Sequence, residues 1–313
     1  LLNYKPLNAY QEVTSVMANV GKTQSTGVEV TINTKNIDTR YFKWTTDFTF
    51  TAYKDRWKER TPDWKPGVYE RVDDPIRPIY TRLADHILQI GEQVPDAQPL
   101  LRPGELVIKD INGYRRDANK QPIVDENGRF VLTGEPDGLI DDADNVLLGS
   151  QDPSWLAGIT NTFKYKDFDL NIQLNGMFGR RMQDPTEMAY GLGGGDLARY
   201  GYNALRKIKD RWTWDNPSTT QPTSFNGWGN NYTSGDWYYQ RAWFIRLTNI
   251  SFGWTLPKAW IARTKVLSRV RLSLSANNLF CITPYKGLDP ETDYYAASYP
   301  NARTYSMGIN VTF

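Results

Sequence analysis

The feature that most constrains this chain is an alternation of apolar and polar residues at every second position. In its last segment, Tyr305, Met307, Ile309, Val311 and Phe313 alternate with Thr, Ser, Gly and Asn residues. Successive side chains of a β-strand point to opposite faces, so this pattern predicts a strand with one apolar and one polar face. Similar alternation predicts strands near 23–33, 41–55, 154–165, 167–179, 241–256, 268–280 and 303–313.

One of these predicted strands changes phase along its length. In the segment 241–256, the first apolar residues, such as Leu247, have odd numbers, whereas those from Ile250 onward have even numbers. One extra residue in the strand would shift the phase in this way. We therefore expect a β-bulge near Thr248 and Asn249.

Alternation alone is compatible with two classes of protein, because a soluble β-sandwich also has one face in water. Two further features favour a transmembrane β-barrel. Trp and Tyr residues lie near predicted strand ends (Trp44, Trp155, Tyr165, Trp254 and Tyr305), as in an interfacial girdle. Short connections alternate with long ones, of which 56–153 and 180–240 are the longest. We expect an all-β, antiparallel transmembrane barrel with long extracellular loops.

Composition excludes several other functions. The 313 residues include 37 Lys and Arg against 35 Asp and Glu, so no basic surface for nucleic acid is expected. No apolar run reaches the roughly 18–20 residues of a transmembrane helix. The single cysteine, Cys281, excludes an intrachain disulfide and is expected to be a small buried residue. The single histidine, His86, excludes a multi-histidine metal site and leaves little scope for an enzyme, so no catalytic residues are assigned.

A series of ordered sequence blocks resembles a known family. From about Arg241 onward these blocks are 244–250, 253–257, 277–280, 287–291, 299–303 and 308–313, and upstream they are 19–21, 26–30 and 149–155. Together they resemble the C-terminal region of the SusC/RagA-type TonB-linked outer-membrane transporters of Bacteroidota. The last strand, Tyr305, Met307, Ile309, Val311 and Phe313, also matches the terminal strand that barrel-assembly machinery recognises in such proteins.

The resemblance implies a fold and a layout. Proteins of this type form a barrel of about 22 strands around an N-terminal plug. The chain would supply about seven or eight C-terminal strands, and residues 1–313 form one barrel segment. The plug, the TonB box and a signal peptide are not recognisable in it, and we expect it to be a fragment or a processed product. Open sheet edges are not tolerated in a membrane, so the remaining strands are expected from elsewhere.

The resemblance also implies a function and partners. A protein of this kind imports oligosaccharides or peptides across a bacterial outer membrane, in contact with outer-membrane lipid. A TonB complex acting on the plug supplies the energy, and a SusD-like surface lipoprotein covers the pore. Polar residues of the strands (Asn171, Gln173, Asn175, Arg271, Ser273 and Asn310) would line the lumen. An outer-membrane enzyme or adhesin barrel and a soluble secreted glycan-binding β protein remain as alternatives.

An acidic loop is a candidate calcium site, although no cofactor is certain. Calcium loops place oxygen ligands at positions 1, 3, 5, 7, 9 and 12 and Gly at position 6. If 114–136 are an insertion, positions 1, 3, 5, 6, 9 and 12 are filled by Asp110, Asn112, Asp137, Gly138, Asp141 and Asp144. SusC/RagA-type proteins often carry an unbroken Asp-x-Asn-x-Asp-Gly stretch here. The alternative is a pair of ordinary Asx turns on a solvated loop.

The long connection 180–240 concentrates aromatic residues, which are Trp212, Trp214, Trp228, Tyr232, Trp237, Tyr238 and Tyr239. Such rings stack on sugars or anchor protein interfaces, so they are candidates for substrate or lipoprotein contact. The alternative is that they pack the loop onto itself. In the same connection, the Gly-rich stretch 191–195 lacks the context of a phosphate loop and is interpreted as a mobile segment. Partly helical spacing predicts short helices at 197–211 and around His86.

Overall fold

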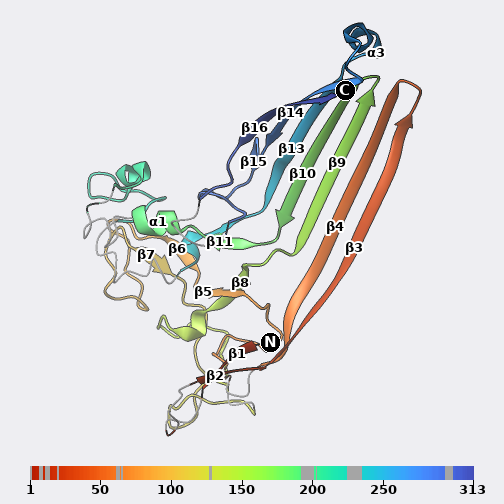
Figure 1. The fold of residues 1–313 in the computed structure, drawn as a ribbon. Helices are drawn as coiled ribbons and strands as arrows, with labels where there is room; N and C mark the ends of the chain where they lie inside the picture. The colour runs from red at the N-terminus through yellow and green to blue at the C-terminus, as the bar shows by residue number, and fades with distance from the viewer. Residues whose placement is uncertain are drawn as a thin grey trace.

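The computed structural model of the protein describes residues 2–6, 10, 15–19, 21–60, 64, 66–126, 129–191, 201, 203–223, 235–292 and 299–313. Its main feature is a long, single-layered antiparallel sheet (Figure 1). The strands are β3 (Lys22–Asp38), β4 (Phe42–Glu59), β9 (Trp155–Tyr165), β10 (Phe168–Phe178), β13 (Phe244–Thr255), β14 (Arg269–Asn277), β15 (Cys281–Ile282) and β16 (Thr304–Thr312). Each of the seven segments with strand-like alternation therefore contains a strand.

The strand order follows the chain. The sheet runs β16-β14-β13-β10-β9-β4-β3, and the short β15 also pairs with β13. Every pairing between these strands is antiparallel. The sheet does not close on itself, and β16 and β3 are its edges. This confirms the predicted fold class, an open part of an antiparallel barrel.

The predicted β-bulge is confirmed. Asn249 of β13 pairs with Gln173 of β10, and Leu247 pairs with Leu174. Thr248 is thus an extra residue in β13. Because of it, the apolar residues before and after the bulge stay on the same face although their numbering changes parity.

Two kinds of connection join the strands. At one end lie the turn 39–41, the turn 166–167 and the connection 256–268, which contains the helix α3 (Lys258–Ile261) and the 3-10 helix η5 (Ala262–Thr264). The opposite end carries the long connections, which form a loop assembly (Figure 1). The difference in length between the two ends matches that of outer-membrane barrels, whose short turns face the periplasm.

The loop assembly has its own small sheets. β5 (Pro78–Thr81) pairs with β8 (Val146–Ser150), β6 (Ala84–Ile87) with β7 (Leu106–Ile108), and β11 (Arg181–Gln183) with β12 (Tyr239–Arg241). Near the N-terminus β1 (Leu2–Pro6) pairs with β2 (Ser15–Asn19). The helical turns are α1 (Pro185–Tyr190), η1 (Asp142–Asp144), η2 (Arg206–Asp210) and η4 (Asp236–Tyr238). Among the described residues, no helix is long and apolar enough to span a membrane.

The buried core lies in the loop assembly. One cluster consists of Ile87, Leu106, Ile108, Trp212 and Tyr238, and a second of Met182, Ala242 and Tyr285. Phe244 and Leu247 of β13 are the buried large apolar residues of the main sheet among those described; the others are half-buried or exposed, and many of the exposed ones lie on β16 and β3. The sheet is therefore not the inner face of a compact soluble core, and its apolar side chains need another environment.

Three local expectations were wrong. His86 lies in the strand β6, because its segment pairs with β7 instead of coiling. Between residues 203 and 211 the chain forms only the 3-10 helix η2, and the expected earlier part of that helix lies outside the described residues. Cys281 is half-buried, because it lies in the two-residue strand β15 beside Arg246.

Candidate functional site

The two faces of the main sheet differ sharply in chemistry, and its register makes each face continuous. One row of paired residues crosses all seven long strands as Ile37, Trp44, Phe163, Leu170, Phe252, Leu274 and Met307. The neighbouring row, on the other face, runs Lys35, Thr45, Thr162, Asn171, Ser251, Ser275 and Ser306. The sheet thus separates an apolar from a polar side along its entire width.

The apolar face carries aromatic residues at both ends. At the end with the short turns, Trp44 stacks on Phe163, and Phe168 stacks on Trp254 with ring centroids 5.8 Å apart. At the loop end, Trp155 stacks on Phe178 and Phe178 on Trp243. Trp155 and Tyr165 lie ten positions apart on β9, about 34 Å along the strand or about 26 Å along the normal at a tilt of about 40°. This spacing matches the apolar band between the aromatic girdles of an outer-membrane barrel.

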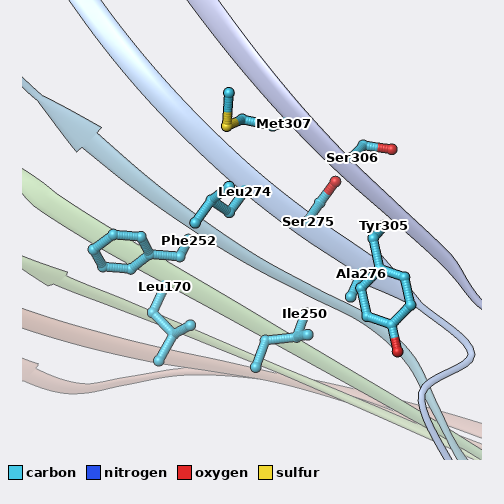
Figure 2. A pocket seen from close by; sticks show the side chains of 9 residues that line it. All are labelled: Leu170, Ile250, Phe252, Leu274, Ser275, Ala276, Tyr305, Ser306 and Met307. Carbon is cyan, nitrogen blue, oxygen red and sulfur yellow. The ribbon is translucent and has the colours of Figure 1, made fainter.

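A shallow depression of about 440 Å³ lies on the apolar face (Figure 2). Leu170, Ile250, Phe252, Leu274 and Met307 are among its lining residues. Met307 is 77% exposed although it lies within a strand. A depression with so few polar groups suits an apolar surrounding such as lipid chains.

The polar face is held together by pairs of side chains between strands. Both carboxylate oxygens of Asp169 on β10 bind the guanidinium of Arg271 on β14, at 2.5 and 2.8 Å. Asn249 donates to Asn277 at 2.7 Å, and Asn33 donates to Asp47 at 2.6 Å. Asn171, Gln173, Asn175, Arg271, Ser273 and Asn310 all lie on this face. The arrangement suits a water-filled lumen.

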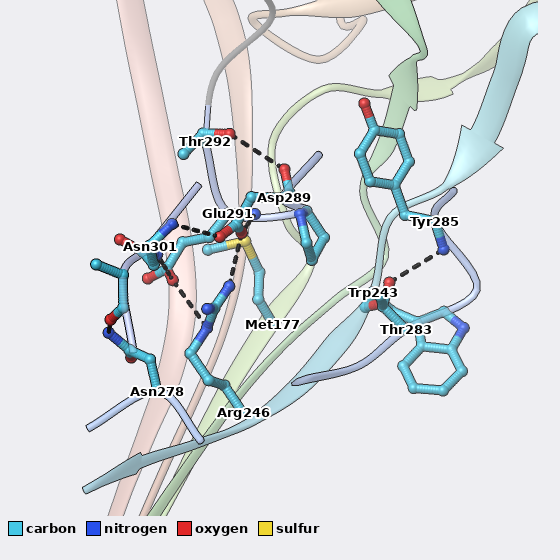
Figure 3. A network of polar contacts seen from close by, with 12 residues as sticks. Met177, Trp243, Arg246, Asn278, Thr283, Tyr285, Asp289, Glu291, Thr292 and Asn301 are labelled. Carbon is cyan, nitrogen blue, oxygen red and sulfur yellow. Dashed lines mark hydrogen bonds and ion pairs between the residues drawn. The ribbon is translucent and has the colours of Figure 1, made fainter. Parts of the chain in front are cut away.

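A buried ion pair fixes the loop after β15 to this polar face (Figure 3). Arg246 of β13 donates to the Asp289 carboxylate at 2.6 Å, and their side chains are only 7% and 4% exposed. The other oxygen of Asp289 accepts the backbone N–H of Asn301 at 3.1 Å. Nε of Arg246 lies 3.3 Å from Glu291, and the Asn301 amide donates to Glu291 at 2.9 Å. The sequence blocks 287–291 and 299–303 thus meet at Arg246, which the sequence alone did not indicate.

The candidate aromatic residues fall into different environments. Trp212, 3% exposed, and Tyr238 belong to the buried core, where the Trp212 ring packs on Gly104; their contact with substrate or lipoprotein stays a prediction. Trp214, 67% exposed, touches Trp212 edge-on with its ring centroid 5.4 Å away. Trp237 and Tyr239 are half-buried. Trp228 and Tyr232, like most of the Gly-rich stretch 191–195, lie outside the described residues.

In the acidic loop, the residues before and after the insertion 114–136 lie close together. Bridges Tyr114–Leu132, Arg116–Pro122 and Val124–Phe130 fold the insertion into a small meander, and the Thr133 N–H donates to the Gly113 carbonyl at 2.9 Å. The two halves of the motif are thereby brought together, and the carboxylate of Asp110 accepts the N–H groups of Asp137 and Gly138.

Many of the aspartate carboxylate oxygens of this loop accept hydrogen bonds from backbone N–H groups. The buried Asp144 carboxylate accepts N–H groups of Ile111, Asn112 and Asp141, at 2.9, 3.2 and 2.9 Å. Asp141 caps η1, and Asp137 accepts the N–H of Leu139. Across the described part of the chain, no group of three His, Cys, Asp or Glu side chains is arranged to hold a metal ion. Calcium binding by Asp110, Asn112, Asp137, Asp141 and Asp144 stays a prediction.

His86 lies between two carboxylates in the loop assembly. Its Nδ1 is 2.9 Å from Asp85 and its Nε2 is 2.6 Å from Glu92. Burial alone would lower the pKa of His86, but the hydrogen bonds to both carboxylates outweigh it and raise the pKa above its usual value. These contacts join the strand β6 to the turn at residues 89–92 through a group of charged side chains.

A polar cavity that the sequence did not reveal lies where β11 meets the sheet. It has a volume of about 100 Å³ and is lined by Arg77, Gln151, Arg180, Arg181, Met182, Gln183 and Tyr239. Arg77 binds Gln151 and Asp152 at 2.9 and 3.2 Å. Only the adjacent pair 180–181 could have hinted at a cationic site in the sequence.

Comparisons with known proteins agree with this geometry. The chain is 29% identical over 339 residues to TonB-dependent receptor P3 of Formosa agariphila, a match that covers all of the chain and 31% of that receptor. It is 25% identical over 318 residues to TonB-dependent receptor SusC of Bacteroides thetaiotaomicron, covering 94% of the chain and 27% of that protein. No protein-family model matches the chain.

The fold is also found among solved structures. The structure of the RagAB peptide transporter superposes with a TM-score of 0.72 at 20% identity, covering 98% of the chain and 31% of the solved chain. The chain thus spans about a third of the length of the relatives it matches. The resemblance predicted from the sequence is confirmed: along nearly its whole length, the chain is similar to part of a SusC/RagA-like TonB-dependent receptor.

Proposed function

We propose that this chain is part of the wall and the extracellular loops of a TonB-dependent transporter in a bacterial outer membrane. The apolar face of the sheet contacts lipid, and the polar face lines a water-filled lumen. The loop assembly forms the outer mouth. The complete protein imports a large nutrient, an oligosaccharide or a peptide, through this lumen.

One observation carries the proposal. The register joins seven strands into a sheet with a continuous apolar face, and the described residues place no second layer over that face. A soluble protein buries such a face, whereas an outer-membrane barrel exposes it to lipid between two aromatic girdles. The named relatives, which are TonB-dependent receptors and a peptide transporter, support the same function.

The partners follow from the same proposal. A TonB complex supplies energy through a plug that belongs to the complete protein. A lipoprotein similar to SusD or RagB covers the loop assembly, where Trp214 is the most exposed of the described candidate aromatic residues. The substrate passes along the polar face, whose amide and hydroxyl groups bind either sugars or peptide backbones.

Transport in reconstituted vesicles tests the proposal. The full-length receptor, its lipoprotein and an energised TonB complex are assembled in liposomes, and uptake of labelled oligosaccharides and peptides is measured. Substrate accumulation that requires TonB energy is expected. A receptor that remains monomeric and soluble without detergent, or vesicles that take up neither class of substrate, would contradict it.

A further inference from the structure

The connection between β13 and β14, residues 256–268, combines exposed cations with an exposed tryptophan. It contains Lys258, Arg263 and Lys265 and neither Asp nor Glu. All three cations are exposed, and they lie on or beside α3 and η5. Buried Ile261 anchors the connection. It projects beyond the strands at the short-turn end (Figure 1).

These cations differ from others on the sheet. Lys35 and Lys43 at the same end share the Asp38 carboxylate, and Arg271 binds Asp169. By contrast, Lys258, Arg263 and Lys265 form no ion pair with a carboxylate of the described residues. Three unneutralised positive charges in 13 residues make this connection attractive to an anionic surface.

The tryptophan joins these charges to the apolar face. Trp260 is 56% exposed, and its ring meets that of Trp254 edge-on with centroids 6.0 Å apart. Trp254 in turn stacks on Phe168 of the apolar face. The apolar surface therefore continues from the strands up to the level of the three cations. A lipid bilayer has the same order, with chains followed by interfacial and then charged headgroup regions.

We propose that residues 256–268 bind a leaflet of anionic phospholipid, with Trp260 at the interface and Lys258, Arg263 and Lys265 on the phosphate groups. The inference rests on the proposed function, because it requires the apolar face to lie in a membrane. Charge complementarity and continuity with the apolar face select a lipid leaflet over a soluble partner. The connection thereby fixes the depth and orientation of this part of the wall.

Lipid exchange on the full-length receptor tests the inference. Receptor in neutral detergent is titrated with labelled phosphatidylglycerol and with labelled phosphatidylcholine at low salt. We expect a preference for phosphatidylglycerol that falls about fivefold for each cation removed, or about 100-fold in the triple variant K258Q/R263Q/K265Q. A control variant, R115Q/R116Q/K120Q, removes three cations from the loop assembly and is expected to keep the preference.

The outcomes separate this inference from the proposed function. Insertion of the receptor into phosphatidylcholine vesicles without any lipid preference would overturn the inference and leave the function intact. Failure to insert into any vesicle would overturn both. The inference would also be overturned if the control variant lost the preference for phosphatidylglycerol to the same extent. It would equally be overturned if inorganic phosphate displaced phosphatidylglycerol beyond the effect of ionic strength.

Discussion

Arg271 and Asp169 form a bidentate ion pair although their strands are not neighbours. β13 lies between them, and the guanidinium crosses this strand directly above Gly253. A Cβ at Gly253 would come within 2.5 Å of Cζ of Arg271. The absence of a side chain at one position therefore allows two strands to be bridged across a third.

Replacing Gly253 tests this bridge. Gly253→Ala should displace the guanidinium and destabilise the receptor by about 1 kcal/mol, since a charge-assisted pair is weakened by partial exposure to water. Thermal unfolding of the full-length receptor in detergent measures the change. Ser251→Ala, on the same face of β13, should have little effect. If Gly253→Ala lowers the stability by the same amount in an Arg271→Gln background, the loss of stability does not come from the Arg271–Asp169 ion pair.

The buried pair Arg246–Asp289 predicts a larger effect. Asp289→Ala removes the buried carboxylate and leaves the buried Arg246 charge with only the more exposed Glu291, which should cost about 3 kcal/mol. The loop after β15 should then detach from the wall and become more sensitive to protease. Glu291→Gln changes a neighbouring, more exposed carboxylate and should cost less than about 1 kcal/mol. Similar protease sensitivity in the two variants would contradict the claim that the Arg246–Asp289 pair fixes the loop after β15 to the sheet.

Adjacent residues of β10 test which face meets lipid. Ile172 lies on the apolar face and Gln173 on the polar face, near the middle of the same strand. Ile172→Arg should destabilise the membrane-inserted receptor by about 2–4 kcal/mol, whereas Gln173→Arg should be tolerated in the lumen. Urea unfolding from lipid vesicles measures both variants. The opposite ranking would reverse the orientation of the wall.

His86 predicts a pH dependence of the loop assembly. Because its pKa is raised in the folded state, the contribution of His86 to stability is complete below its unfolded value of about 6.5 and is lost as pH rises through the raised pKa. Hydrogen exchange of 84–92 should therefore accelerate from mildly acidic to alkaline pH, beyond the intrinsic pH effect. His86→Gln should flatten this dependence, and an unchanged profile would contradict the prediction.

At low pH, the stability of the segment 84–92 is expected to fall as the pH is lowered. The pKa of Asp85 is lowered chiefly by its hydrogen bond to His86, and that of Glu92 chiefly by the backbone N–H of Gln89. Their contributions are present above their unfolded values of about 4 and are lost as pH falls through the lowered pKa values. The segment should therefore be most protected between about pH 4.5 and 6.5.

The predicted calcium site has a separate test. If the rejoined acidic loop binds Ca²⁺ as its sequence pattern predicts, calorimetric titration of the full-length receptor should give saturable heat. Asp137→Asn should reduce that heat, whereas Asp117→Asn, in the inserted meander, should leave it unchanged. Heat that is absent from the wild type would show that the carboxylates serve only the backbone N–H groups.

The strand pattern was accessible from the sequence, because alternation is a local property. The two-residue period places Phe252 and Trp254 on one face of their strand and Ser251 and Gly253 on the other, whatever the rest of the chain does. Even the bulge at Thr248 was visible as a change of parity in 241–256. These local rules also predicted the all-β class and the separation of an apolar face from a polar face.

The packing of the loops could be seen only in the tertiary structure, because their contacts join residues that are far apart in the chain. Trp212 and Trp214 are only two positions apart and equally aromatic, yet one is buried against Gly104 and the other is exposed. Arg246 and Asp289 are 43 residues apart, and nothing local relates them. The sequence by itself therefore determined the strands and their two faces, whereas only long-range packing decided which loop residues are core, which fix the loop to the sheet, and which remain exposed.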